Sequence, residues 1–160
     1  MAIQVGDDIP DCTVSHMTAD GPVSITTKDL FWGRKVVLFA LPGAFTPTCS
    51  ARHLPGFIQN ADAIKARGVD MIVCLSVNDA FVMGAWGRDQ EAGDAVLMVA
   101  DGNGGFTRAV GLELDVTGFG MGKRSQRYSM IIEDGVVRAL NVEAPGAFEV
   151  SSAETVLRQL

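Results

Sequence analysis

Apolar runs separated by polar and glycine-marked segments set the pattern of this chain. Residues 36–41 are apolar throughout, and a second largely apolar run covers residues 69–77. Runs of this length that are apolar on both faces are typical of buried parallel strands. A third run at 96–100 ends at the glycine-rich loop 101–105. We therefore expect three strands that form the interior of a sheet.

The segment between the first two runs is predicted to be a helix that starts at Pro47. Thr46 is a favoured N-cap residue, and proline suits the first helical position, where no amide hydrogen is needed. We expect the Thr46 hydroxyl to accept a hydrogen bond from an amide of the first turn. The helix should run toward Arg67 and end at Gly68. Pro55 breaks the pattern, because a proline inside a helix removes a hydrogen bond, and we predict a kink that limits any unwinding to the first two turns.

The rest of the chain adds further helices and one antiparallel hairpin. Asp134 and Gly135 are a favoured pair for a type I′ turn between two strands. The expected elements are a helix from Asp79 through about Ala92, a short helix after loop 101–105, strands at 128–133 and 136–142, and a last helix from Ser151 or Ser152 through Leu160. This order favours an α/β fold with a central mixed sheet flanked by helices, in a single domain of residues 1–160.

Composition narrows the class of protein. The chain has 160 residues, of which 48% are hydrophobic, and this is ample for one core. It contains no run of about 18 apolar residues, and residues 1–8 lack the features of a signal peptide, so we expect neither a membrane span nor export. Three cysteines without an export signal favour a reducing compartment, and we expect a cytoplasmic protein. The net charge of −6 argues against nucleic acid as a partner.

Cys49 is the strongest candidate for chemistry. It falls at the third position of the predicted helix, and a helix N-terminus favours the reactive thiolate over the thiol. No acidic residue occurs from residue 30 to residue 61, whereas Arg34, Lys35 and Arg52 lie in that window. The alternative is a buried structural cysteine, which is common among free cysteines. The cap, the proline and the charge pattern together favour a reactive thiolate.

A helix terminus alone is too weak to activate such a thiol. Lowering a thiol pKa from about 8.5 to about 6 takes roughly 3.4 kcal/mol. A helix terminus supplies about 0.3–1 kcal/mol, and about 2 kcal/mol in favourable geometry. A cation or several hydrogen bonds to the sulfur must therefore contribute. Arg52 could do so locally, because helical side chains lean toward the N-terminus, and Arg127 is another candidate that spacing alone does not distinguish from the other cations.

The segment Pro42–Cys49 resembles the active-site signature of the peroxiredoxins. Together with residues 53–56, it is similar to the small atypical subgroup called type II or type five. Residues 73–86 resemble the next strand and helix of that subgroup, residues 122–129 its arginine-bearing segment, and residues 134–143 its terminal hairpin. The resemblance covers nearly the whole chain and implies a thioredoxin-like fold.

The resemblance also implies a reaction and roles for named residues. The Cys49 thiolate would attack hydrogen peroxide or an organic hydroperoxide, giving water or an alcohol and a sulfenic acid. The Thr46 hydroxyl and the Cys49 amide would donate to the peroxide, Arg127 would hold both thiolate and peroxide, and Pro42 would shield the sulfur from water. For Thr46 the plain N-cap role is a compatible alternative. The resemblance implies a homodimer, and no cofactor is expected.

Reduction of the sulfenic acid is the open part of the cycle. Some members of the subgroup carry a resolving cysteine near the C-terminus, but residues 146–152 contain none. Cys74, 25 positions after Cys49, has the spacing of members thought to form an intramolecular disulfide, yet its strand context favours a buried inert thiol. We expect a one-cysteine cycle reduced by glutathione with glutaredoxin or thioredoxin. The alternatives are a Cys49–Cys74 disulfide reduced by thioredoxin, and a peroxide sensor or holdase without turnover.

The two histidines carry weaker signals. His53 shares a helical face with Cys49 and could donate a proton or assist the glutathione step. We expect instead a neutral histidine at the surface or at an interface. His16 lies four residues after Cys12, but two candidate ligands do not make a metal site, and we expect no metal.

Overall fold

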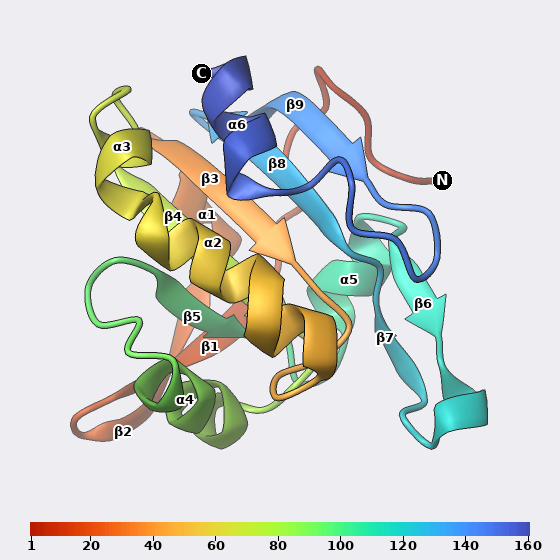
Figure 1. Cartoon of the computed structure of the whole chain (residues 1–160). Coiled ribbons are helices and arrows are strands. Elements are labelled where there is room, and N and C mark those ends of the chain that lie inside the picture. Colours follow the sequence, from red (N-terminus) through yellow and green to blue (C-terminus); the bar gives the residue numbers. More distant parts are fainter.

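A seven-stranded mixed sheet forms the centre of the computed structural model, which describes residues 1–160 (Figure 1). The order of strands across the sheet is β2-β1-β5-β4-β3-β8-β9. Their bounds are β1 Thr13–Thr18, β2 Gly21–Thr26, β3 Lys35–Ala40, β4 Met71–Ser76, β5 Leu97–Ala100, β8 Tyr128–Glu133 and β9 Val136–Val142. A separate two-stranded sheet consists of β6 Glu113–Asp115 and β7 Lys123–Ser125, joined through a 3₁₀ turn, η2, at Thr117–Phe119.

The pairing of the strands confirms the predicted mixed sheet. Strands β3, β4 and β5 pair in parallel, whereas β8 runs antiparallel to both β3 and β9. At the β8–β9 turn, Asp134 and Gly135 have φ angles of 49° and 76°, both positive as a type I′ turn requires. The hairpin β1–β2 and the small sheet β6–β7 are additions that the apolar pattern did not predict.

Helices cover both faces of the central sheet. Their bounds are α1 Thr27–Phe31, α2 Leu54–Gln59, α3 Ala61–Lys65, α4 Ala80–Asp89, α5 Gly105–Ala109 and α6 Ala153–Gln159, with a π-helical segment, η1, at Cys49–His53. Helices α2, α3, α4 and α6 pack on one face, and α1 and α5 pack on the other (Figure 1). As predicted, Asp79 caps α4 by accepting from the amide of Val82. None of the helices is long and apolar enough to cross a membrane.

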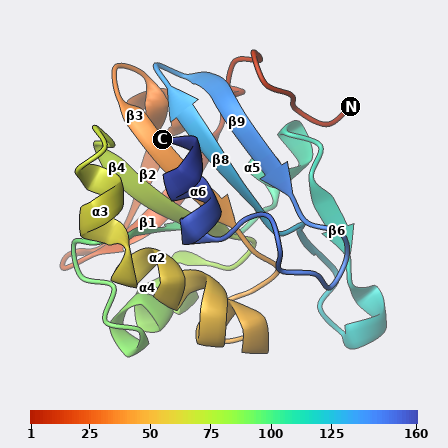
Figure 2. The ribbon, with the colours of Figure 1, turned by 45° about the horizontal axis from the view of Figure 1, so that its top comes forward.

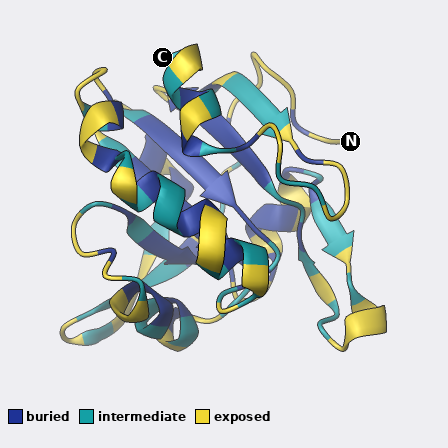
Figure 3. Ribbon diagram, in the orientation of Figure 1, coloured by how far each residue is buried: buried dark blue, intermediate teal, exposed yellow.

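Alternation along the buried strands sorts the side chains into two cores. In β3, Val37 and Phe39 face one core, while Val36 and Leu38 face the other. The same alternation in β4 places Cys74 in the first core, the one that also contains Cys49. These inner strands are the most deeply buried part of the ribbon (Figure 3). The period of β4 therefore directs Cys74 to the face of the sheet on which the helix of Cys49 packs.

The helix that carries Cys49 differs in detail from the expected one. It begins at Pro47 as predicted, but residues Cys49–His53 are π-helical before α2 begins. The amide of Leu54 donates to the carbonyl of Cys49, five residues back. Pro55 lies just after the π segment, so its missing amide falls where the hydrogen-bond register of the helical run changes. The sequence did not predict this π segment, and the helical region is divided again at residue 60. The limit that Pro55 sets on unwinding stays a prediction.

Candidate active site

The candidate site lies where two parallel strands, β3 and β4, reach their carboxyl ends. The chain leaves β3, passes through the turn at residues 42–46 and enters the helix of Cys49. The loop after β4 supports this turn, because the side-chain oxygen of Asn78 accepts from the amide of Ala44 at 3.0 Å. The same oxygen accepts from the Ser76 hydroxyl at 2.6 Å. The turn that positions Cys49 is thus fixed by a neighbouring strand.

Cys49 is fully buried and has one cationic partner. Its Sγ accepts a hydrogen bond from Nη2 of Arg127 at 3.1 Å. Arg127 immediately precedes β8, which pairs directly with β3. Arg52, the local candidate, instead stacks its guanidinium over the Phe148 ring, 4.7 Å from the ring centre. Of the two cations that the sequence offered, the structure brings Arg127 to the sulfur.

His53 lies at the centre of the site and not at the surface, so that prediction was wrong. The residue is fully buried, and its Nδ1 lies 2.8 Å from Nη1 of Arg127. Its Nε2 lies 3.0 Å from the carbonyl oxygen of Ser151. An arginine can only donate and a carbonyl can only accept, so Nδ1 must be the acceptor and Nε2 must carry the proton. His53 is therefore a neutral imidazole of one defined tautomer.

The electrostatics of His53 agree with this assignment. Burial lowers its pKa most, and the charge of Arg127 lowers it further. The hydrogen bond to Ser151 and the charge of Glu143 act in the opposite direction, and the net pKa is about 3. His53 therefore stays neutral near pH 7, as expected. Its depressed pKa keeps the Nδ1 lone pair available to Arg127 throughout the neutral range.

Thr46 does not form the N-cap hydrogen bond that the sequence suggested. Its hydroxyl donates to the carbonyl of Gly43 at 2.7 Å, across the turn, and does not accept from an amide of the helix. The contact of Thr46 with the first turn is instead a backbone hydrogen bond, in which the carbonyl of Thr46 accepts from the amide of Ser50 at 2.9 Å. Phe45, with φ of 64°, bends the chain so that Gly43 comes within reach of the hydroxyl. Short polar side chains commonly satisfy a nearby carbonyl in this way.

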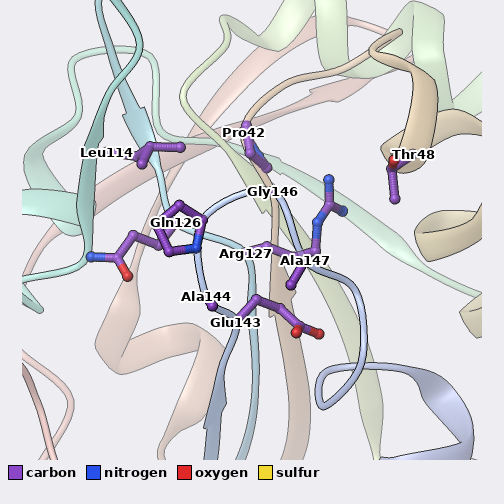
Figure 4. Close-up of a pocket in the computed structure, with 10 residues that line it drawn as sticks. Pro42, Thr48, Leu114, Gln126, Arg127, Glu143, Ala144, Gly146 and Ala147 are labelled. Atoms are coloured by element: carbon purple, nitrogen blue, oxygen red, sulfur yellow. The ribbon is translucent and has the colours of Figure 1, made fainter.

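A pocket of about 110 Å³ opens beside Arg127. A single water needs only about 10–15 Å³, so the pocket has room for molecules larger than hydrogen peroxide. Figure 4 shows Arg127 between Pro42 and Thr48 on one side and Glu143 on the other. The remaining lining residues are Leu114, Gln126, Ala144, Pro145, Gly146 and Ala147. Cys49 itself does not line the pocket, but its hydrogen-bond partner Arg127 and its neighbour Thr48 do.

The other two cysteines have different surroundings. Cys74 is fully buried in β4, opposite Phe39 of β3. Its pKa is raised well above the ordinary value, first by burial and then by Cys49, with Arg127 opposing in part. Cys12 is half-buried near the N-terminus, and burial together with Asp101 and Asp11 raises its pKa. Neither of these cysteines has the cationic hydrogen bond that Cys49 has.

Sequence reasoning missed several polar residues that support the site. Arg124 donates to the carbonyl of Pro42 at 3.2 Å and so holds the turn from the side of β7. Glu143 organises the loop after β9, and Ser151 of that loop anchors His53. These contacts join residues that are far apart in the sequence, so no local motif predicts them. The sequence held one signal, the position of Asn78 two residues after the end of the buried parallel strand β4, where polar groups often converge on a site.

One family model and several known proteins match this chain over most of its length. The family model described as Redoxin matches residues 4–157. A relative from Oryza sativa subsp. japonica, "Peroxiredoxin-2E-2, chloroplastic", is 54% identical over 163 residues, covering 99% of this chain and 72% of the relative. "Peroxiredoxin-2B" of Arabidopsis thaliana is 47% identical over 159 residues, covering 99% of this chain and 98% of the relative.

A solved structure extends the similarity to three dimensions. The crystal structure of reduced Prx3 in complex with H2O2 from Vibrio vulnificus superposes with a TM-score of 0.95. It is 58% identical to this chain, and the match covers 98% of each chain. The thioredoxin-like arrangement expected from the sequence is therefore the observed fold.

Proposed function

This chain belongs to the peroxiredoxins, the thiol peroxidases of the redoxin family, and we propose that it runs a one-cysteine cycle in which glutathione with glutaredoxin regenerates Cys49. The single observation that carries the role of Cys49 is the 3.1 Å hydrogen bond from Arg127 to its Sγ. Charge-assisted hydrogen bonds stabilise an anion more strongly than neutral ones, so this contact favours the thiolate. Arg127 is thus the cation that was expected to contribute, because a helix terminus alone is too weak to activate the thiol.

In the proposed first step, the sulfur attacks the terminal oxygen of the hydroperoxide. The S–O bond forms as the O–O bond breaks, and the leaving oxygen departs as alkoxide or hydroxide and takes up a proton. Cys49 is oxidised to the sulfenic acid, and the peroxide is reduced to an alcohol or water. Each of these changes is a two-electron change, so no cofactor is needed.

Donors aimed at the two peroxide oxygens stabilise the charge that develops in this step. Arg127 has five N–H donors, and the contacts to His53 and Cys49 leave others free to face the pocket that it lines. The Thr46 hydroxyl has one proton, which it now gives to Gly43, so we propose that it exchanges this bond for one to the peroxide. The Cys49 amide adds a further donor, and Pro42 walls the pocket and excludes water.

The second half of the cycle is proposed to use an external thiol. Position 151 and its neighbours offer serine rather than cysteine, and Cys74 sits in the middle of a buried strand. Cys49 and Cys74 share one core, and both are free thiols that are fully buried in this structure. Glutathione attack on the sulfenic acid gives a mixed disulfide and water, and glutaredoxin or thioredoxin then reduces the disulfide.

Turnover measurements test this proposal directly. Peroxide consumption is followed with glutathione and glutaredoxin, and separately with thioredoxin, for the native protein and for Cys49→Ser and Cys74→Ser. We expect many equivalents of peroxide per subunit, complete loss in Cys49→Ser and retention in Cys74→Ser. Loss of turnover in Cys74→Ser with thioredoxin would favour the intramolecular disulfide. Consumption of only one equivalent by the native protein would favour a sensor or holdase.

We also propose a homodimer in a reducing compartment such as the cytoplasm. Phe45 and Phe81 are 53% and 65% exposed, and contiguous apolar patches on a surface commonly mark contact sites. Phe45 packs against Trp86 of α4, the helix that also carries Phe81. Three free thiols suit a reducing environment. Sedimentation equilibrium of the native protein and of Phe81→Ser tests the dimer, and a monomeric native protein would refute it.

A further inference from the structure

Glu143 is a buried carboxylate outside the residues that contact sulfur, and it is saturated with hydrogen bonds. It directly follows β9, and both of its oxygens accept from the amide of Glu149 at 2.9 Å. One oxygen also accepts from the amides of Val150 and Ser151 at 2.9 and 2.8 Å, and from the Ser151 hydroxyl at 2.6 Å. A single side chain thus clamps three successive residues of the loop between β9 and α6. Figure 2 shows this loop as it leaves β9 and returns to α6.

The clamped loop is the one that anchors His53. The carbonyl oxygen of Ser151 lies 3.0 Å from Nε2 of His53, and Nδ1 of that ring lies 2.8 Å from Arg127. Arg127 in turn donates to the Cys49 sulfur at 3.1 Å. Glu143 also touches the other end of this chain of contacts, because its amide donates to the backbone carbonyl of Arg127 at 2.9 Å.

We propose that Glu143 is a positioning residue for peroxide reduction, which acts on Cys49 through the Ser151 carbonyl, His53 and Arg127. Without the clamp, the Ser151 carbonyl loses the position that fixes the His53 ring. The ring then no longer holds Nη1 of Arg127, and the guanidinium is free to leave the sulfur. The same loop supplies Ala144–Ala147 to the wall of the pocket, so the clamp also shapes the path of the peroxide.

The charge of Glu143 works against this positioning effect, and that opposition makes the proposal testable. A carboxylate near the site disfavours a second anion, the Cys49 thiolate, by charge repulsion. Removing the charge alone would therefore favour the thiolate and move the rate profile to lower pH. Removing the clamp would weaken the contact of Arg127 and move the profile to higher pH. The direction of the shift separates the two roles.

The experiment compares Glu143→Gln with the native protein in stopped-flow reactions with hydrogen peroxide from pH 4 to pH 9. We expect the second-order rate constant at pH 7 to fall about tenfold, the size of one lost hydrogen bond to a charged group, and the pH profile to move to higher pH. Glu133→Gln is the matched control, since Glu133 is exposed at the far end of β8 from Arg127, and it should leave both quantities unchanged. A profile that stays in place or moves to lower pH would overturn the proposal.

A double-mutant cycle with His53→Gln tests the route. If Glu143 acts through His53, Glu143→Gln should have little further effect in the His53→Gln background. Full additivity of the two effects would overturn the route. Should Glu143→Gln fail to fold, Ser151→Ala removes only the hydroxyl contact and keeps the amides and the carbonyl. This milder variant should lower the rate by severalfold in the native background and not in His53→Gln, and an equal loss in both would contradict the proposal.

Discussion

Cys49 and Cys74 are both fully buried and face the same core, yet their polar surroundings are opposite. Cys49 lies at the start of a helix and accepts a hydrogen bond from Arg127. Cys74 lies in the middle of a central strand, where burial is the largest influence on its pKa and raises it. The depth of a thiol in the core is the same in the two cases, so depth does not decide reactivity. We propose that the cation at hydrogen-bond distance from Cys49 makes the difference.

The two sites also differ in how their neighbours are fixed. Around Cys74 the contacts are those of regular strands, with Phe39 directly opposite. Around Cys49, Arg127 is held by His53, which is held by the loop after β9. A long flexible side chain such as arginine points at one atom only when other groups restrain it. Arg127 is thus a restrained cation, and we propose that this restraint, and not proximity alone, is what a reactive Cys49 requires.

Removing the Arg127 cation should reduce the difference in reactivity between Cys49 and Cys74 most strongly. We expect Arg127→Gln to lower the rate constant for hydrogen peroxide by about 10²–10³-fold, as for the loss of a donor aimed at developing charge. Arg127→Lys should recover only part of this loss, since a single ammonium cannot form the same fork to His53 and Sγ. Stopped-flow fluorescence gives the rates, and circular dichroism checks the fold. A native-like rate in Arg127→Gln would show that the contact with Sγ is not needed.

A second difference between the two cysteines is the Thr46 hydroxyl, which we propose binds the peroxide next to Cys49. Thr46→Val keeps the shape of the side chain but removes the hydroxyl, and we expect about a 10²-fold loss of peroxidase rate with the fold preserved. Thr46→Ser keeps the donor to Gly43 and should remain active. Rates for both variants are compared under the same conditions as for Arg127. Equal rates in the valine and serine variants would exclude the hydroxyl from the reaction.

His53 supplies a prediction about pH and stability. Its pKa in the folded protein is about 3, below its ordinary 6.5, so between these pH values the unfolded chain binds a proton at His53 and the folded chain does not. Its contribution to stability is therefore present above about pH 6.5 and is lost as the pH falls toward 3. We expect the free energy of unfolding to fall less steeply over this window in His53→Gln than in the native protein. Urea titrations at several pH values measure it, and identical slopes would contradict a neutral buried His53.

Cys74 should give the smallest effect on chemistry. Cys74→Ala leaves the contact between Arg127 and Cys49 in place, and we expect an unchanged rate of sulfenic acid formation. The lost sulfur leaves a small cavity in the core, which should lower the free energy of unfolding by about 1 kcal/mol. Denaturant titration and the peroxide rate are measured on the same sample. A slower first step would show that Cys74 assists Cys49 directly.

The local pattern of apolar runs and turn residues predicted much of the fold. The strands at 36–41, 69–77 and 96–100 appear within a few residues of their predicted bounds, and the turn at Asp134 and Gly135 has the expected geometry. Short hairpins such as β1–β2 were not predicted, because they lack a clear apolar run. The π segment at Cys49–His53 was also missed, because it depends on hydrogen-bond register rather than on composition.

Less of the candidate site could be predicted, for a physical reason. The cysteine at the helix start and the need for a further cation follow from the local sequence and from the size of the helix effect. The choice of Arg127 over Arg52, and the burial of His53, depend on contacts between residues more than 70 positions apart. A surface position for His53 was the natural expectation, because nothing in its helix reveals that the loop after β9 covers it.

The sequence by itself determined an α/β chain with a cysteine at the start of a helix and with no acidic residue nearby. Those properties depend on neighbouring residues, whose hydrogen bonds and charges act over one or two helical turns. Only the tertiary structure decided which cation reaches the sulfur, which tautomer His53 adopts and how Glu143 holds the loop above it. Pairing of β8 with β3 and the return of the chain after β9 bring these distant groups together. That convergence is set by packing of the whole core, which no local segment encodes.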